Sequence, residues 1–264
     1  YRRLQQYTKI DWPQRLSDLD NLDEGLARLR EQISRSRSFK KRLHIKSYYR
    51  LLVSLAARRE EILRPSNVYH AVIVATYNES LEILEPTLES IINSDYDVKR
   101  IWLFIAYEEE QTKSNAEHLV KKYGSKFGYA EAVMHPKDLP TEVIGKGGNI
   151  TYTGRRLKKY VQKRGTNPEN VIVTTLDSDN RPAKNYFSYL TFIYSTARDR
   201  IHKSFQPIPM FYNNIWDAPA PMRVIATGNS FWMLIQSMRP HLLRNFSAHA
   251  QSLKTLIDTD FWSV

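Results

Sequence analysis

Leucine and isoleucine recur at three- and four-residue spacing through the first 65 residues, a pattern typical of amphipathic helices. The two apolar stripes consist of Leu16, Leu19, Leu22, Leu26, Leu29 and Ile33, and of Leu51, Leu52, Leu55 and Ile62. Residues 34–42 interrupt the stripes with serine among arginine and lysine, so we expect a loop there. Arg64-Pro65 closes the region, because proline lacks a backbone donor and disfavours helix in the residue before it. The pattern predicts a helical appendage over residues 1–65.

From Val68 onward, short β-branched runs alternate with amphipathic stretches, which is typical of repeated βα units. The expected strands are Ala71–Thr76, Arg100–Ala106, Tyr129–Met134 and Val171–Leu176, and the expected helices are Ser80–Asn93, Lys113–Tyr123 and Asn149–Arg164. Such units build a mostly parallel sheet flanked by helices. We therefore expect an α/β domain over residues 66–264.

The chain becomes aromatic and rich in proline after Arg181-Pro182, and we expect irregular structure there. One exception is the apolar run Tyr186–Ala197, which carries serine and threonine. Because a membrane helix needs roughly 18 apolar residues, this shorter run predicts a buried helix instead.

The 264-residue chain carries a net charge of +11 that is unevenly distributed. Residues 1–65 hold 16 Lys/Arg and 8 Asp/Glu, which leaves only +3 for the rest. A basic flank suits anionic lipid headgroups or nucleic acid, and the alternative is a solvated helix surface. The absence of cysteine excludes thiolate metal sites and a cysteine nucleophile, and the seven histidines lack zinc-site spacing.

Polar residues follow the expected strands, and in open parallel sheets ligands bind at the carboxyl ends of the strands. These segments are Thr76-Tyr77-Asn78-Glu79, Tyr107-Glu108-Glu109-Glu110, Asp177-Ser178-Asp179-Asn180 and, between the third and fourth strands, Gly145-Lys146-Gly147-Gly148-Asn149. Collected at one edge, they supply an aromatic face, several carboxylates, a lysine and a glycine turn.

The strongest of these signals is Asp177-Ser178-Asp179. Two carboxylates that flank one small residue after an apolar strand offer oxygen ligands to Mg²⁺ or Mn²⁺, which would neutralise a diphosphate. The alternative is an Asx turn, since Asp, Ser and Asn all favour turns.

The segment Gly145–Asn149 predicts a loop that leads into a helix N-terminus, a position that favours anions, with Lys146 as a mobile positive charge. It matches neither the P-loop nor the dinucleotide fingerprint, and a helix cap without a ligand is the alternative.

The other strand ends leave two interpretations open. One of Glu108, Glu109 and Glu110 accepts hydrogen bonds from a base or ribose, or the trio is an exposed helix start. Tyr77 stacks on a nucleobase, or it is simply packed.

Four segments together resemble family 2 glycosyltransferases of the membrane-bound, cellulose-synthase-like type, which have the GT-A fold. Residues 71–79 resemble the opening P-x-Y-N-E strand, and Lys146-Gly147-Gly148-Asn149-Ile150 resembles the K-x-G-N-L segment. Asp177-Ser178-Asp179 resembles the D-x-D motif, and Thr227–Trp232 resembles the G-[ST/G]-x-x-F segment. The resemblance covers residues 68–264 and implies inverting transfer of a sugar, from a nucleotide diphosphate sugar such as a UDP-sugar, to a glycan or lipid-linked acceptor.

Carried over to this chain, the resemblance implies a role for each matching residue. The nucleotide sugar is held by Thr76, Tyr77, Glu79, Glu108, Lys146, Asn149 and Asp177; Mn²⁺ or Mg²⁺ is held by Asp177 and Asp179; and the acceptor side is lined by Gly228, Asn229, Phe231 and Trp232. The family's general base lies in a T-E-D-like motif that is absent here, as is Q-x-x-R-W. Asp258 and Asp260 are the nearest acids, but we expect the base to lie beyond Val264.

The resemblance also implies a location at the cytoplasmic face of a membrane, with residues 35–42 near anionic headgroups. Three alternatives stay open: a nucleotidyltransferase, although its glycine- and arginine-rich loop is missing after the first strand; a basic nucleic-acid-binding module, although no such signature is present; and an inactive scaffold. We expect no nucleic-acid partner.

Overall fold

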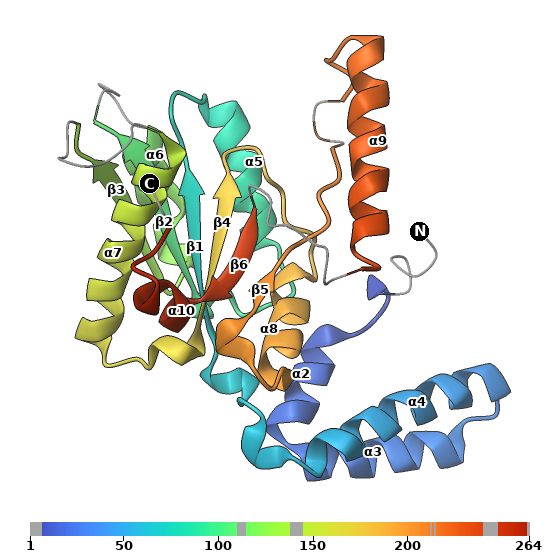
Figure 1. The fold of residues 1–264 in the computed structure, drawn as a ribbon. Coiled ribbons are helices and arrows are strands. Elements are labelled where there is room, and N and C mark those ends of the chain that lie inside the picture. Colours follow the sequence, from blue (N-terminus) through green and yellow to red (C-terminus); the bar gives the residue numbers. More distant parts are fainter. Residues whose placement is uncertain are drawn as a thin grey trace.

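The computed structural model describes residues 7–109, 115–137, 145–211, 213, 215–239 and 248–262. A six-stranded sheet runs through its centre in the order β3-β2-β1-β4-β6-β5 (Figure 1). The strands are β1 (Tyr69–Ala75), β2 (Ile101–Glu108), β3 (Tyr129–His135), β4 (Val171–Asp177), β5 (Ser204–Phe205) and β6 (His249–Ser252). Strands β1 to β4 are parallel, whereas β6 is antiparallel to both β4 and β5. The prediction of a mostly parallel α/β sheet flanked by helices is confirmed.

Helices cover both faces of the sheet, because alternate side chains of each strand point to opposite faces. On one face lie α5 (Leu81–Ile92), α6 (Asn115–Tyr123) and α8 (Tyr186–Thr196), and on the other α7 (Lys146–Arg164) and α10 (Leu253–Asp258). Val72 and Val74 join the first core, and Ala71 and Ile73 join the second. Short 3₁₀ helices fill connections at 59–61, 65–67, 98–100, 124–126, 168–170 and 200–202.

The N-terminal helices α2 (Trp12–Asp20), α3 (Leu22–Arg35) and α4 (Phe39–Ala56) join the first core. Trp12 is 1% exposed, and its ring lies 4.5 Å from Tyr189 and 5.4 Å from Phe192 of α8, measured between centroids. Helices α3 and α4 form a hairpin that projects from the body (Figure 1). The predicted appendage is therefore helical, with α2 packed on the sheet-covering helices.

The predicted loop over residues 34–42 is wrong in length. Helix α3 continues to Arg35 and α4 begins at Phe39, so only residues 36–38 connect them. Ser38 caps α4, its Oγ accepting a hydrogen bond from the Lys41 backbone N–H at 3.4 Å. Lysine and arginine then continue the helix, because both favour helical backbone.

The prediction of irregular structure after Arg181 is also wrong in part. The buried helix expected at 186–197 is present as α8, but the 17-residue helix α9 (Ala220–Gln236) and the antiparallel strands β5 and β6 were not expected. Pro219 precedes α9 and Pro221 lies in its first turn, where proline costs no hydrogen bond. In the part of the chain that the structure describes, no helix has both the length and the apolar character needed to cross a membrane.

Candidate active site

The candidate site lies where β1 and β4 end side by side. From β1 the chain winds outward to β2 and β3, and β4 then pairs with the other side of β1, so the strand order reverses between these two strands. Ligands bind at such switch points in open α/β sheets. The register pairs Ala75 with Asp177, which places Thr76 beside the start of the Asp177-Ser178-Asp179 turn.

The turn that follows β4 is held in place by hydrogen bonds to its own backbone and to two separate segments, α5 and the segment before α9. The Asp177 carbonyl accepts a hydrogen bond from the Asn180 backbone N–H at 3.1 Å. The Ser178 carbonyl accepts from Thr87 Oγ1 at 2.7 Å, and the Asp179 carbonyl accepts from Asn213 Nδ2 at 2.8 Å. Asn180 Oδ1 in turn accepts from the Asp177 backbone N–H at 3.1 Å. The backbone that carries the two carboxylates is thus fixed before any ligand binds.

Sequence reasoning missed two of these supports. Thr87 lies inside α5 and is buried, and Asn213 lies 34 residues beyond Asp179. Neither belongs to a motif, and a single threonine or asparagine gives no signal of a contact so distant along the chain. Only the packing of α5 and of the segment before α9 reveals their role.

The two carboxylates of the turn have different environments. Asp177 is 35% exposed in its side chain and forms an ion pair with Lys146, which is 36% exposed. Asp179 is exposed, and its Oδ1 accepts a 3.3 Å hydrogen bond from its neighbour Asn180. No group of three His, Asp or Glu suited to a metal ion occurs among the residues that are described. Two carboxylates nevertheless fit Mg²⁺ or Mn²⁺, because Mg²⁺ is commonly held by one or two carboxylates together with waters and substrate phosphates.

Lys146 reaches Asp177 because α7 begins at this edge. The predicted loop over 145–149 is wrong, since the helix starts at Lys146 and Gly147 and Gly148 lie in its first turn. Gly145 precedes the helix with φ 149°, a backbone conformation open almost only to glycine. Asn149 is 2% exposed, and its Oδ1 has no hydrogen-bond partner among the residues that the structure describes. The positive end of the helix dipole and the ammonium group thus both lie near Asp177.

The loop after β1 contributes an aromatic face. Thr76 is buried, whereas Tyr77 is 60% exposed. The Glu79 carboxylate accepts a hydrogen bond from the Tyr77 backbone N–H at 2.7 Å, so its position is determined by the loop itself. Of these three predicted ligands, Tyr77 offers the most open surface.

The acidic residues after β2 divide between strand and turn. Glu108 belongs to β2 and lies 2.8 Å from His135 Nδ1 on the neighbouring strand β3, and both side chains are mostly buried. Glu109 accepts a 2.8 Å hydrogen bond from the Lys137 backbone N–H. Glu110 lies outside the described residues. These contacts give Glu108 a structural partner across the sheet, and its role toward a nucleotide stays a prediction.

The structure does not bring the two candidate bases to this cluster. Asp258 forms a 2.5 Å ion pair with Lys254 one turn earlier in α10, and Asp260 lies 3.4 Å from Arg155. Arg155 follows Lys146 by nine residues of helix, or about 13 Å along the axis. These contacts give neither carboxylate support as the general base.

His249, which the sequence analysis did not single out, and Trp262 lie close to the site. His249 of β6 pairs with Thr175, two residues before Asp177. Trp262 Nε1 lies 3.2 Å from His249 Nε2, and the Trp262 carbonyl accepts from Thr151 of α7 at 3.2 Å. Their positions follow from the antiparallel pairing of β6, which no local pattern indicated.

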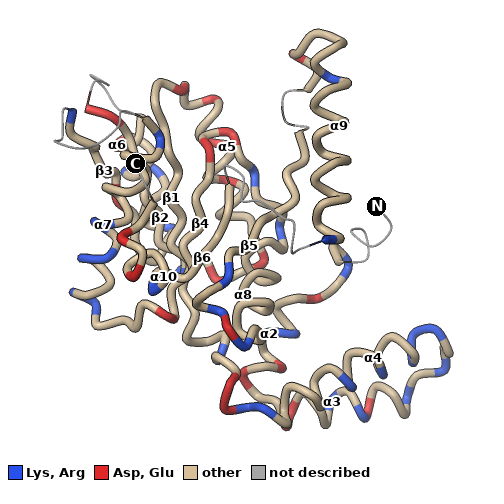
Figure 2. Tube along the Cα trace, in the orientation of Figure 1, with Lys and Arg blue, Asp and Glu red and all other residues tan. Residues whose placement is uncertain are grey.

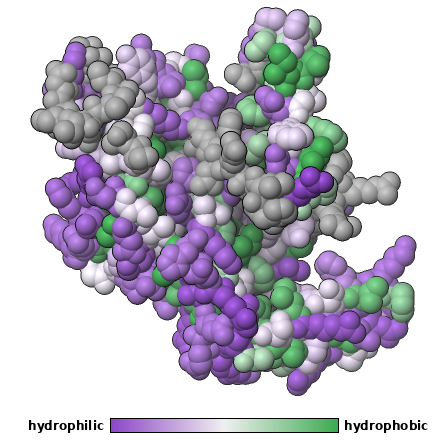
Figure 3. All heavy atoms as spheres, viewed as in Figure 1, coloured by the Kyte–Doolittle hydropathy of each residue, from purple (hydrophilic) through white to green (hydrophobic). Residues whose placement is uncertain are grey.

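The segment expected to line the acceptor side lies on α9, which stands beside the sheet (Figure 1). The residues in question, Gly228, Asn229, Phe231 and Trp232, are all exposed. Val224, Phe231 and Trp232 share one face at helical spacing, and Figure 3 shows apolar side chains on the surface of this helix. Ser230 on the opposite face is buried and accepts from the Phe211 backbone N–H at 3.2 Å.

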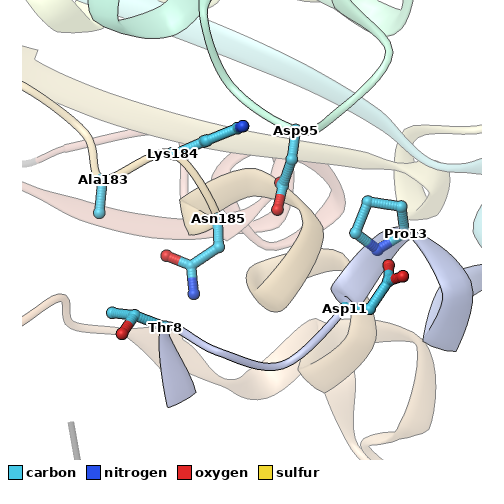
Figure 4. A pocket seen from close by; sticks show the side chains of 7 residues that line it. All are labelled: Thr8, Asp11, Pro13, Asp95, Ala183, Lys184 and Asn185. Atoms are coloured by element: carbon cyan, nitrogen blue, oxygen red, sulfur yellow. The ribbon is translucent and has the colours of Figure 1, made fainter. Parts of the chain in front are cut away.

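A pocket of about 330 Å³ lies elsewhere, between the N-terminal segment, the loop after α5 and the segment before α8 (Figure 4). It is lined by Thr8, Asp11, Pro13, Asp95, Ala183, Lys184 and Asn185. None of these is a predicted site residue. The chemistry at the strand ends therefore marks the candidate site more clearly than the size of this pocket does.

No protein-family profile and no curated protein matches the sequence. The solved structures that resemble the fold include S. aureus TarS 1-349, with 15% identity, a TM-score of 0.41, and alignment over 74% of this chain and 50% of that one. A second is the mannosyltransferase PcManGT from Pyrobaculum calidifontis in complex with GDP-Man and Mn²⁺, with 17% identity, a TM-score of 0.45, and 74% and 48% covered. TarS 1-349 in complex with UDP-GlcNAc aligns with 15% identity and a TM-score of 0.41, and the alignment covers 74% of this chain and 48% of that one. This chain thus spans about half the length of these proteins, and likenesses this distant carry no argument about activity.

Proposed function

We propose that this chain is the donor-binding region of a metal-dependent glycosyltransferase of family 2 with the GT-A fold. The observation that carries the proposal is the ion pair between Lys146 at the start of α7 and Asp177 at the end of β4, located at the β1/β4 switch point. It joins a phosphate-binding lysine to a carboxylate pair where α/β sheets bind nucleotides.

In this proposal each residue has one task toward a nucleotide diphosphate sugar. Tyr77 stacks on the nucleobase, Lys146 and the N-terminus of α7 contact the diphosphate, and Asp177 and Asp179 hold Mg²⁺ or Mn²⁺. The positive charge of such an ion, when bound, offsets the negative charge that grows on the leaving diphosphate.

The reaction class is inverting displacement at the anomeric carbon. An acceptor hydroxyl oxygen forms the new bond, the bond to the diphosphate oxygen breaks, and the hydroxyl proton passes to a general base. Phe231 and Trp232 on α9 are proposed to face the acceptor, a glycan or a lipid-linked sugar. The base is left unassigned, because Asp258 and Asp260 are both paired away from the strand-end cluster.

The tip of the α3–α4 hairpin supports a second part of the proposal, contact with an anionic membrane at its cytoplasmic face. Five cationic residues lie within residues 35–42, and Figure 2 shows Lys and Arg gathered at this end of the hairpin. Phe39 and Leu43 are 72% and 59% exposed beside them. Cations next to exposed apolar side chains suit a headgroup surface.

Calorimetry with UDP, GDP and CMP, each in Mn²⁺, Mg²⁺ or EDTA, tests the donor site. We expect one nucleotide to bind in the presence of a metal, and Asp179→Asn to weaken that binding at least tenfold, a loss seen even for residues that only support a metal ligand. Asp217→Asn, an exposed carboxylate before α9, serves as the control and keeps full binding. Binding that is indifferent to EDTA, or absent from the whole panel, would contradict the proposal.

Flotation with phosphatidylserine vesicles tests the membrane contact separately. We expect binding at low salt that disappears when Arg37, Lys40 and Lys41 are replaced by glutamine, with nucleotide binding unchanged. Retention of vesicle binding by that variant would refute a role for the hairpin tip.

A further inference from the structure

We infer that Lys146 makes cation binding at this site conditional on a ligand that carries a diphosphate. This rests on the proposed function, but it goes further, because it states in what form the site accepts the metal. The physiological ligand is then the cation together with the diphosphate, and the free cation is a poor ligand.

The contact behind this inference joins two elements that are far apart in the sequence. Lys146 Nζ binds Asp177 Oδ1, so the ammonium group covers one of the two carboxylates that are available to a cation. Asp179 is the other carboxylate of the turn, and no third His, Asp or Glu completes a metal-binding group among the described residues. A free cation would therefore meet one open carboxylate with a positive charge beside it.

The parts of the site differ in how freely they move. The turn at 177–179 is fixed by hydrogen bonds to each of its three carbonyls, so the backbone that carries the carboxylates stays in place. Lys146 has a flexible four-carbon stem, and about a third of its side chain is exposed. Ion pairs this exposed are weak and readily exchanged. Lys146 is thus the group that moves when a ligand arrives.

Charge explains why each ligand favours the binding of the other. Lys146, Asp177 and Asp179 together carry one net negative charge. When only a divalent cation binds, the net charge of the site becomes +1. When only a sugar nucleotide diphosphate binds, its two negative charges make the net charge −3. With both bound, the net charge returns to that of the empty site. Lys146 then pairs with a phosphate oxygen, and Asp177 is released to the cation.

The expected consequence is reciprocal coupling between the two ligands. Couplings of this kind commonly change affinity by about 5- to 150-fold, and each ligand must strengthen the other by the same factor. Removing the lysine charge should therefore improve the binding of the cation alone, whereas a lysine that only contacts phosphate would leave it unchanged.

The test is a titration with Mn²⁺ in the absence of nucleotide, followed by the electron paramagnetic resonance signal of the free ion. We expect Lys146→Met to bind Mn²⁺ at least about fivefold more tightly than the wild-type protein. Lys163→Met, an exposed lysine in the last turn of the same helix, loses the same charge and should stay within about twofold of wild type.

The reverse experiment uses UDP in EDTA with Asp177→Asn. We expect about fivefold tighter binding than wild type, because the ion pair between Lys146 and Asp177 and the repulsion between carboxylate and phosphate are both removed. Thermal melting checks that each variant is folded. We expect both variants to fold, because the side chains of Lys146 and Asp177 are partly exposed.

The outcomes separate the inference from the proposed function. Equal Mn²⁺ affinity in Lys146→Met and Lys163→Met, with metal-dependent UDP binding intact in wild type, would overturn the inference alone. Failure of wild type to bind UDP, GDP or CMP with Mn²⁺ would overturn both.

Discussion

Two carboxylate–cation pairs in this molecule differ in burial, and the difference shows what an ion pair can be used for. Asp18 of α2 is 2% exposed and is bound by Arg28 of α3 at 2.5 Å and by the Tyr48 hydroxyl of α4 at 3.0 Å. Asp177 and Lys146 are each about one-third exposed. The first pair ties three helices together, whereas the second is open to exchange with a ligand.

The surroundings of Asp18 explain why it belongs to the fold. Burial raises the pKa of the Tyr48 hydroxyl, and the adjacent Asp18 carboxylate raises it further, so the tyrosine stays a hydrogen-bond donor. Gly25 of α3 lies so close that an added Cβ would be 2.9 Å from Asp18 Cβ. A carboxylate enclosed in this way has no surface left for a ligand.

Removal of the buried carboxylate should have the largest effect. We expect Asp18→Ala to lower the free energy of unfolding by about 3 kcal/mol, because it leaves the Arg28 charge and the Tyr48 hydroxyl without their partner. Urea denaturation measures the change. Asp23→Ala, which removes an exposed carboxylate paired with Arg59, should stay within about 0.5 kcal/mol. Equal losses of unfolding free energy in Asp18→Ala and Asp23→Ala would show that burial does not make the Asp18 pair more important for stability.

A second buried polar group should give a pH effect. Burial and, to a smaller extent, the Arg100 charge together lower the pKa of His70 to about 3, and Nε2 lies 2.8 Å from Thr191 Oγ1. The pKa of His70 in the folded protein lies below the unfolded value of about 6.5, so the neutral histidine makes its full contribution to the free energy of unfolding above pH 6.5. That contribution falls as the pH drops, and about 2 kcal/mol of it is lost at pH 5.

Denaturation at pH 7 and pH 5 measures this loss. His70→Gln should lack the His70 contribution, whereas His44→Gln, a change at an exposed histidine of α4, should retain it. A wild-type protein with equal stability at both pH values would contradict the buried, neutral state of His70.

The exposed pair should matter much less for stability. We expect Asp177→Ala to change the free energy of unfolding by less than about 1 kcal/mol, since ion pairs this exposed contribute about that or less. The same variant should bind the donor nucleotide poorly in Mn²⁺, which calorimetry measures. A loss of stability close to that of Asp18→Ala would mean that the turn after β4 is structural.

Substitutions in α9, where the exposed side chains are apolar, should have the smallest effect on the free energy of unfolding. Phe231→Ser and Trp232→Ser should leave the free energy of unfolding, measured by urea denaturation, within about 0.5 kcal/mol of wild type, because both side chains are more than half exposed. Leu88→Ala in α5, which is fully buried, should cost about 2–5 kcal/mol and provides the contrast. A large loss from the α9 variants would show that the stripe packs against the body.

The sheet was predictable because its signals are local. Each of the four parallel strands is a short run rich in apolar residues, and the polar residues after these runs were expected at one edge. The register of β1 and β4 pairs Ala75 with Asp177, so Thr76 and Asp177 lie beside each other at that edge. Helix α9 was missed, because prolines at 219 and 221 suggested a break where they instead begin a helix.

The partners of the site residues were harder to predict. Glu108 was expected to face a ligand, yet the register of β2 and β3 places it beside His135. Lys146 was expected in a loop, and it reaches Asp177 because α7 begins one turn earlier. Both outcomes depend on contacts between residues 27 and 31 positions apart, which neither spacing nor propensity encodes.

The sequence by itself determined the four parallel strands, most helices and the set of polar residues at the strand ends, because hydrophobic periodicity and turn chemistry act over a few residues. Only the tertiary structure decided which of those polar residues pair with each other and which remain open. The physical reason is burial. The same carboxylate chemistry is locked at Asp18, where three helices exclude water, and exchangeable at Asp177, where the sheet edge meets solvent.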